Sequence, residues 1–206
     1  MALIRLDDKV RIITAIAEAE KHTAGEIVCI VHRSASRYGY VPILWAALIA
    51  LMLPWGLIRF TQLGIETVHL IQMAVFLILA VALWALPMPV RMRMVPGALK
   101  RQRAARAARE QFQANDLVQT AGRTGCLIYV AEAEHYAAVL ADEGIASKVD
   151  PEVWQRAIVA LTDALKAGRA ADGFIAAIGL CGAVLTQHVP PVADDINELP
   201  NRLIIL

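Results

Sequence analysis

The chain has 206 residues, of which 58% are hydrophobic and 19% charged, and its formal net charge is +1 at pH 7. Soluble domains contain about 45–50% apolar and about 25% charged residues, and here the apolar excess is concentrated between residues 41 and 90, which indicates membrane spans rather than a large core. The near-zero net charge excludes a global basic field, so we expect no nucleic-acid partner.

The cysteines and the N-terminus indicate a cytoplasmic, reducing setting. Cys29, Cys126 and Cys181 are odd in number, lie in apolar runs and show no Cys-x-x-Cys or Cys/His spacing. We therefore expect buried, reduced thiols rather than a disulfide framework. The first ten residues are charged and contain no apolar segment, so no cleavable signal peptide is expected and the first span must direct the chain to the membrane.

A helix is expected first, because Leu6, Val10, Ile13 and Ala17 recur at helical spacing. Gly25 ends this region, and residues 26–31 then read as a strand that is apolar on both faces. Such a strand belongs in the middle of a covered sheet. One helix cannot bury it, so its partners must come from later in the chain.

Residues 41–90 are predicted to form a transmembrane hairpin with spans at about 41–58 and 68–88. Neither stretch contains a charged residue, apart from a neutral His69, and each approaches the roughly 20 residues that cross a bilayer as a helix. Pro54 is expected to kink the first span or end it early. The alternative, two buried core helices of a soluble protein, conflicts with the lack of any polar face.

The basic residues predict the orientation. Arg33 and Arg37 precede the hairpin and seven cations follow it between residues 91 and 109, whereas the connecting loop contains only Arg59. By the positive-inside rule, both termini of this two-span inner-membrane protein are cytoplasmic. We expect lipid head-group contacts from a basic set, which comprises Arg91, Arg93, Lys100, Arg101 and Arg103. Nucleic-acid binding by this run would need aromatic interleaving, which the run lacks.

The second half supplies the missing partners. We predict a helix from Pro96 to about Asn115, an apolar strand at 125–130, an antiparallel neighbour at 136–141, and two closing helices that begin near Asp150 and Asp172. The fold class is therefore α/β, a three-layer sandwich with a small mixed sheet, made of a parallel first pair plus an antiparallel hairpin. Residues 1–38 and 91–206 form this discontinuous domain. The apolar tail, 199–206, either adds an edge strand to this sheet or pairs with a partner.

Several of these segments together resemble the TPM-domain family. They are Thr23-Ala24-Gly25-Glu26-Ile27-Val28, the run Arg123-Thr124-Gly125-Cys126-Leu127-Ile128-Tyr129-Val130 with its hairpin, and the closing helix pair with Trp154 and Gly173. The resemblance covers about residues 7–33 and 97–190 and implies a three-layer sandwich. It implies functions that range from phosphatase activity and divalent-cation binding to assembly or repair of membrane complexes. The inserted hairpin and the missing upstream segment depart from the family pattern.

Two polar clusters are candidates for a site. The first is acidic and would hold Ca²⁺ or Mg²⁺ if its oxygens converge at one end of the sheet; it comprises Glu26, Asp142, Asp194, Asp195 and Glu198. Solvated acids are the alternative. The second, Arg123-Thr124-Gly125, would bind phosphate through the guanidinium and backbone N–H groups, or is a plain turn. His135, in the hairpin turn, has no assigned partner and is expected to be an ordinary surface histidine.

Two functions follow from these expectations. The first is an interaction or assembly module at the cytoplasmic face of the inner membrane, with the bilayer and another membrane protein or complex as partners. The second is a divalent-cation-dependent phosphatase that uses the acidic crevice. The sequence contains no GxSxG, P-loop, HExxH or Cys-x5-Arg motif, so it does not decide whether the chain is an enzyme.

Overall fold

The computed structural model describes residues 4–118, 120, 122–191 and 199–206. In chain order its elements are α1 (Leu6–Glu20), β1 (Ile27–His32), α2 (Tyr40–Phe60), α3 (Ile65–Trp84), α4 (Met88–Arg93), α5 (Gly97–Ala114), β2 (Cys126–Ala131), β3 (Tyr136–Ala141), α6 (Glu143–Ala146), α7 (Pro151–Lys166), α8 (Ala170–His188) and β4 (Leu203–Ile205). The chain divides into two compact units. We call residues 1–35 with 102–206 the α/β unit, and residues 36–101 the hairpin unit.

The α/β unit is built around a four-stranded mixed sheet in the order β3-β2-β1-β4. β1 and β2 are parallel, with Ile27 opposite Cys126, and β3 is antiparallel to β2, with Ala141 opposite Cys126. The predicted parallel pair and antiparallel hairpin are therefore confirmed. The tail provides β4, which pairs in parallel with β1 and places Leu203 opposite Cys29.

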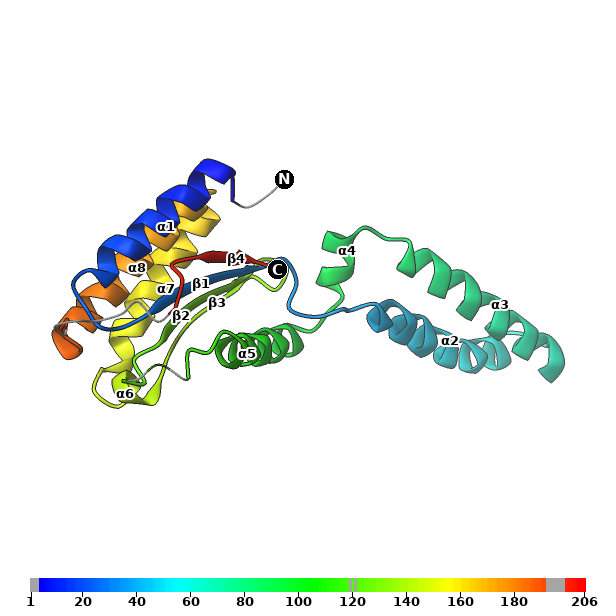
Figure 1. Ribbon diagram of the computed structural model, residues 1–206. Helices are drawn as coiled ribbons and strands as arrows, with labels where there is room; N and C mark the ends of the chain where they lie inside the picture. The colour runs from blue at the N-terminus through cyan, green and yellow to red at the C-terminus, as the bar shows by residue number, and fades with distance from the viewer. Residues whose placement is uncertain (1–3, 119, 121, 192–198) are drawn as a thin grey trace. The chain divides into compact units, whose positions relative to one another are not determined.

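Helices cover both faces of the sheet (Figure 1). Because side chains alternate along a strand, Cys29 packs into a core with α1, α7 and α8, whereas Val28 packs into a second core against α5. Phe174 is fully buried in the first core, and Ala108 of α5 is buried in the second. The strands are therefore apolar on both faces because both faces are covered.

The face of α1 that is buried differs from the predicted one. Leu6 is 79% exposed, whereas Ile12 and Ile16 are fully buried. The reason lies in α8, where a Cβ added at Gly182 would lie only 3.0 Å from the Cβ of Ala19. The missing side chain lets α1 approach α8 closely along the side that carries Ala19, and this packing determines which apolar residues of α1 face inward.

The start of α7 follows the predicted signal at Asp150. The Asp150 side chain accepts a hydrogen bond from the Glu152 N–H at 2.9 Å, and Pro151 occupies the first helical position. Both features satisfy or remove donors that a helix N-terminus leaves unpaired. Gly168, with φ +72°, follows the helix and adopts the left-handed conformation that favours glycine.

The hairpin unit consists mainly of two long apolar helices that pack against each other, α2 and α3, joined by residues 61–64. Both are long and apolar enough to cross a membrane by length and composition. α2 continues as a helix through Pro54 to Phe60, so the proline does not end it as one reading of the sequence expected. The observed bounds, 40–60 and 65–84, lie near the predicted spans of 41–58 and 68–88.

A third helix, α8, also meets the length and composition of a span. Its inward side chains nevertheless belong to the α/β core, because Phe174, Ile178, Cys181 and Leu185 are buried against the sheet and the neighbouring helices. This packing accounts for its apolar character without a membrane.

Candidate functional site

The strand register brings parts of both predicted clusters to one edge of the sheet. Ile27, Cys126 and Ala141 lie opposite one another across β1, β2 and β3, so the residues just outside this row, Glu26 and Asp142, share the edge at which β1 and β2 begin. The Glu26 carbonyl accepts the Cys126 N–H at 2.8 Å, and the Gly125 carbonyl accepts the Asp142 N–H at 2.9 Å. Two strand spacings, about 9.6 Å, separate the two backbones.

Asp142 is a buried carboxylate at this edge. Its side chain is only 6% exposed, and Oδ1 accepts hydrogen bonds from the Glu143 N–H at 2.7 Å and from Arg123 Nη2 at 3.3 Å. Oδ2 is buried and has no hydrogen-bond partner among the described residues. Asp142 therefore caps the short helix α6 and receives the arginine of the other predicted cluster.

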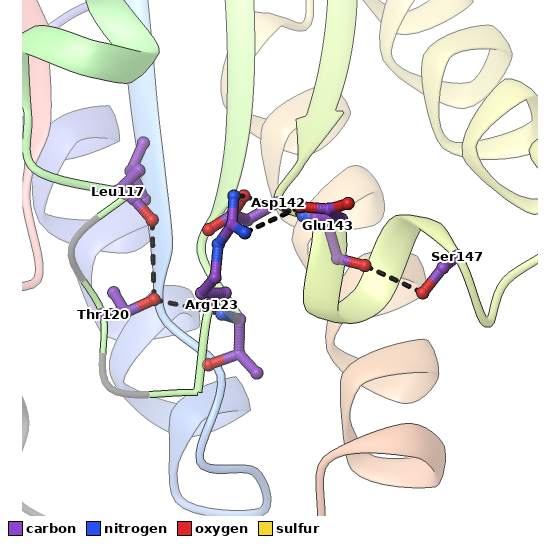
Figure 2. Close-up of polar contacts among 7 residues, drawn as sticks. Leu117, Thr120, Arg123, Asp142, Glu143 and Ser147 are labelled. Atoms are coloured by element: carbon purple, nitrogen blue, oxygen red, sulfur yellow. Dashed lines mark hydrogen bonds and ion pairs between the residues drawn. The ribbon is translucent and has the colours of Figure 1, made fainter.

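Arg123 joins the two clusters, as Figure 2 shows. Its Nη1 donates to Glu143 Oε2 at 2.7 Å while Nη2 reaches Asp142. The hydrogen bond and the charge of Asp142, followed by the charge of Glu143, raise the pKa of the guanidinium. The backbone of Arg123 is left-handed, with φ +50°. We call Arg123, Asp142 and Glu143, with Thr120 and Thr124, the amino-edge cluster.

The two threonines hold the loop that carries Arg123. Thr120 Oγ1 accepts the Thr124 N–H at 3.0 Å, the Thr120 carbonyl accepts the Arg123 N–H at 2.9 Å, and Thr124 Oγ1 donates to the Ala24 carbonyl at 3.2 Å. Two N–H groups predicted to cradle a phosphate are thus already used within the loop. An anion at this loop would meet the guanidinium of Arg123 rather than those N–H groups.

Two glycines next to the amino-edge cluster lie directly against backbone carbonyl groups of the loop. A Cβ at Gly125 would lie 2.5 Å from the Leu117 carbonyl oxygen, and one at Gly144 would lie 2.6 Å from the carbonyl oxygens of both Gly122 and Arg123. The loop therefore packs on β2 and α6 with no space for a side chain at either glycine.

The predicted acidic site is only partly described. Glu26 is buried, but Asp194, Asp195 and Glu198 lie outside the described residues. Among the described residues, no group of three or more His, Cys, Asp or Glu side chains is placed to hold a metal ion. Asp142 also faces a guanidinium, which would repel a bound cation. The described residues by themselves therefore do not fit a complete Ca²⁺ or Mg²⁺ shell.

Glu20, at the end of α1, is a half-buried polar residue that the sequence does not predict. Its Oε1 accepts the Ile27 N–H at 2.8 Å, and burial, together with the charge of Glu26, raises the pKa of Glu20 to about 8 even though the hydrogen bond opposes the shift. The sequence places Glu20 beside Lys21 and His22, which suggests a solvated helix end. Only the return of the chain into β1 brings its carboxyl under the sheet.

The shifted pKa of Glu20 predicts a pH-dependent stability. The fold favours the protonated carboxyl, so this contribution is complete below about pH 4.5 and is lost as the pH rises to about 8. Glu20→Gln keeps an acceptor for the Ile27 N–H without the charge. At pH 8.5 we expect the variant to have a free energy of unfolding about 2 kcal/mol above wild type, after allowance for solvent screening.

Denaturant unfolding of the detergent-solubilised chain at pH 5 and pH 8.5 measures this difference. Glu18→Gln is the matched control, because Glu18 lies on the same helix and is exposed. Its free energy of unfolding relative to wild type should be the same at both pH values. A Glu20→Gln advantage that does not grow with pH would contradict the burial argument.

A second polar group lies at the opposite edge, after β1 and β2. His32 Nδ1 and the Tyr129 hydroxyl are 3.0 Å apart, and burial lowers the pKa of His32. Glu134 is buried, and its Oε1 accepts the Ala35 N–H at 3.1 Å and the Ser34 hydroxyl at 3.4 Å. Glu134 thus connects the segment after β1 to the β2–β3 turn. This structural role was not predicted from the sequence.

The predicted head-group residues lie on α4 and α5. Arg93 and Arg101 are exposed, whereas Arg91, Lys100 and Arg103 are half-buried. Lys100 Nζ donates to the Met92 carbonyl at 3.3 Å, and the indole Nε1 of Trp45 on α2 donates to the Met94 carbonyl at 3.2 Å. Both bonds lie within the hairpin unit and hold α4 and the segment that follows it in place.

Comparisons with known proteins relate residues 88–184 to one family. A family model described as the TPM domain matches residues 88–184. Among solved structures, the NMR structure of the BA42 protein from the psychrophilic bacterium Bizionia argentinensis is similar, with a TM-score of 0.61 and 19% sequence identity over 98% of this chain and 95% of that chain. At this identity the likeness establishes the fold alone. No curated protein matches the chain.

Proposed function

We propose, from the match of residues 88–184 to the TPM domain, that this chain is a two-span inner-membrane protein whose α/β unit serves as an interaction or assembly module. The α/β unit lies at the cytoplasmic face, and both termini are cytoplasmic. Its partners are the bilayer and another membrane protein or complex.

The apolar surface of the hairpin unit supports this proposal most directly. Buried residues make up only 22% of the apolar window of α2 and 6% of that of α3. Leu70, Leu77 and Val81 of α3 each expose more than half of their surface. Contiguous apolar surface of this extent marks an interaction site with lipid or protein, and the helices have the length of a bilayer core.

The distribution of charge supports the orientation. The loop between α2 and α3, residues 61–64, carries no charged residue, and Arg59 and Glu66 flank it. All five predicted head-group residues lie on the other side of the hairpin in the sequence. Positive residues next to spans favour the cytoplasmic side, where each one close to anionic lipid contributes about 1 kcal/mol of attraction.

Alkaline carbonate extraction tests membrane insertion. The wild-type chain should stay in the membrane pellet. Leu77→Lys combined with Ile78→Lys should release a large part of it, because each central lysine costs about 3 kcal/mol of insertion free energy. Leu180→Lys, on the exposed side of α8, is the matched control and should remain in the pellet. Release of the wild-type chain by carbonate would refute the insertion.

The state of the amino-edge cluster supports a module rather than an enzyme. The Arg123 guanidinium is paired with both Asp142 and Glu143, and loop groups occupy the Arg123 and Thr124 N–H donors. A phosphate would have to displace two carboxylates to reach the arginine. Charged groups and N–H donors that already pair with one another stabilise the local structure more readily than they bind a substrate.

A divalent-cation-dependent phosphatase is the second candidate, and one observation favours it. Asp142 Oδ2 is buried without a hydrogen-bond partner among the described residues, and Glu20 and Glu26 add two further carboxyls at the same edge. Buried carboxylate oxygens that lack a donor are suited to a cation. The acids at 194, 195 and 198 would have to complete its shell.

Hydrolysis of a generic phosphate ester by the detergent-purified chain, with and without Mg²⁺ or Ca²⁺, separates the two candidates. The module predicts background rates under every condition. Metal-dependent turnover that disappears in Asp142→Asn but persists in Asp163→Asn would establish the enzyme. Asp163 is the matched control because it is exposed and forms an ion pair with Lys166 on α7.

A further inference from the structure

The outer edge of β3 is the feature from which we draw a further inference. β3 is the last strand of the sheet on its side. The Cys126 N–H donates toward β1 and the Asp142 N–H donates toward β2, and donors alternate in direction along a strand. The even-numbered residues of β3 therefore bond to β2, while the N–H and C=O groups of Ala137, Val139 and Ala141 point away from the sheet.

No protein group among the described residues pairs with these outward donors and acceptors. The strand also lacks the usual protection of an edge, because Tyr-Ala-Ala-Val-Leu-Ala contains no charge and no proline. Five of its six residues are half-buried rather than buried. An uncharged edge of this kind is a template for another strand.

We infer that the occupant of this edge is a second copy of the same chain, paired β3 to β3 in antiparallel orientation about Val139. A two-fold axis through Val139 places Ala137 opposite Ala141 of the other copy, and in each of these pairs the outward N–H and C=O groups face each other. The two sheets then join into one continuous eight-stranded sheet. The inference goes beyond the proposed function, because it concerns self-association through the α/β unit and not the membrane.

The charges next to the strand favour a second copy and this register. With Val139 opposite itself, the turn that contains His135 lies beside the Asp142–Glu143 segment that follows β3 of the other copy. Glu143 is 75% exposed although it bonds to Arg123, so its carboxylate remains accessible to a second hydrogen-bond donor. No like charges face each other along the paired segment, since residues 136–141 are uncharged. Shifting the axis to Ala138 would lose one of the outward pairs.

A cavity beside the edge agrees with this arrangement. It measures about 460 Å³ and lies between the start of β3 and the end of α7, with Ala137, Thr162 and Leu165 in its walls. His135, Lys166 and Glu132 also line it. In the paired sheet, Ala137 of this cavity lies opposite Ala141 of the other copy, so the Asp142–Glu143 segment that follows Ala141 comes near the wall that contains Lys166.

Cysteine cross-linking of the detergent-purified full chain tests the register. Val139→Cys should form a disulfide-linked dimer under mild oxidation, because directly opposite residues have Cα atoms about 5.5 Å apart, within the range of a disulfide. Ala137→Cys alone should not, since the two copies of this residue lie about 13 Å apart along the strands. A mixture of Ala137→Cys and Ala141→Cys should cross-link. The native cysteines are buried and should not interfere.

The native mass tests the edge itself. Wild-type chain should be dimeric by light scattering in detergent, and Val139→Pro should be monomeric. This proline removes an outward donor and leaves the bonds between β2 and β3 in place, so the variant should keep its circular dichroism spectrum. A monomeric wild type, a dimer that persists in a folded Val139→Pro variant, or equal cross-linking of Val139→Cys and Ala137→Cys would overturn the inference.

Discussion

Gly144→Ala should lower the free energy of unfolding of the α/β unit by about 3 kcal/mol. A Cβ at this position would lie 2.6 Å from two carbonyl oxygens of the loop, those of Gly122 and Arg123. Backbone oxygens cannot move aside as a flexible side chain does, so α6 and the loop must separate. That separation also lengthens the hydrogen bond from Arg123 to Asp142.

Denaturant unfolding in detergent measures this loss, and Gly179→Ala is the matched control. Gly179 lies within α8, and a Cβ there meets no atom within 4 Å. The control should gain up to about 1 kcal/mol, because alanine favours a helix more than glycine does. If Gly144→Ala were as stable as wild type, the close packing of α6 on the Arg123 loop would be wrong.

Ile178→Ala should cost about 3–4 kcal/mol of unfolding free energy. Ile178 is 1% exposed and packs in the core that α8 shares with the sheet. Removing its side chain leaves a cavity in addition to the lost apolar burial.

Leu180→Ala provides the comparison for Ile178, because it truncates another aliphatic side chain two positions along the same helix. Leu180 is 39% exposed, so its truncation should cost less than about 1 kcal/mol. Equal losses for the two variants would contradict the placement of α8 in the core and would support a third membrane helix instead.

The sequence predicted the elements whose signals are local. The parallel and antiparallel strands follow from apolar runs, and α7 follows from Asp150 and Pro151, which act within one helical turn. The hairpin helices follow from the length of two uncharged stretches. Each of these signals depends only on residues that are close in the chain.

Features that depend on distant packing were not predictable in the same way. α1 carries apolar residues on more than one face, and the choice of Ile12 and Ile16 over Leu6 depends on Gly182, more than 160 residues away. Periodicity alone cannot decide between such faces. The packing partner determines the buried stripe.

The candidate site shows the same limit. Arg123 and Asp142 were predicted as members of two separate clusters, one for phosphate and one for a cation. Their ion pair requires the β2–β3 hairpin to return the chain to its starting edge in register. The carboxyl of Glu20 likewise reaches this edge only through the turn into β1. These contacts cannot be predicted from the spacing of the residues along the chain.

Membrane topology tests the central claim most directly, because residues 1–35 and 102–206 must meet on one side of the bilayer to form a single sheet. A reporter that fluoresces only in the cytoplasm should be bright when fused to either terminus. Leu63→Cys, in the loop between α2 and α3, should react with an impermeant maleimide added to intact cells. One bright and one dark terminus would contradict the account, because a sheet that pairs β1 with β2 and β4 could not then form.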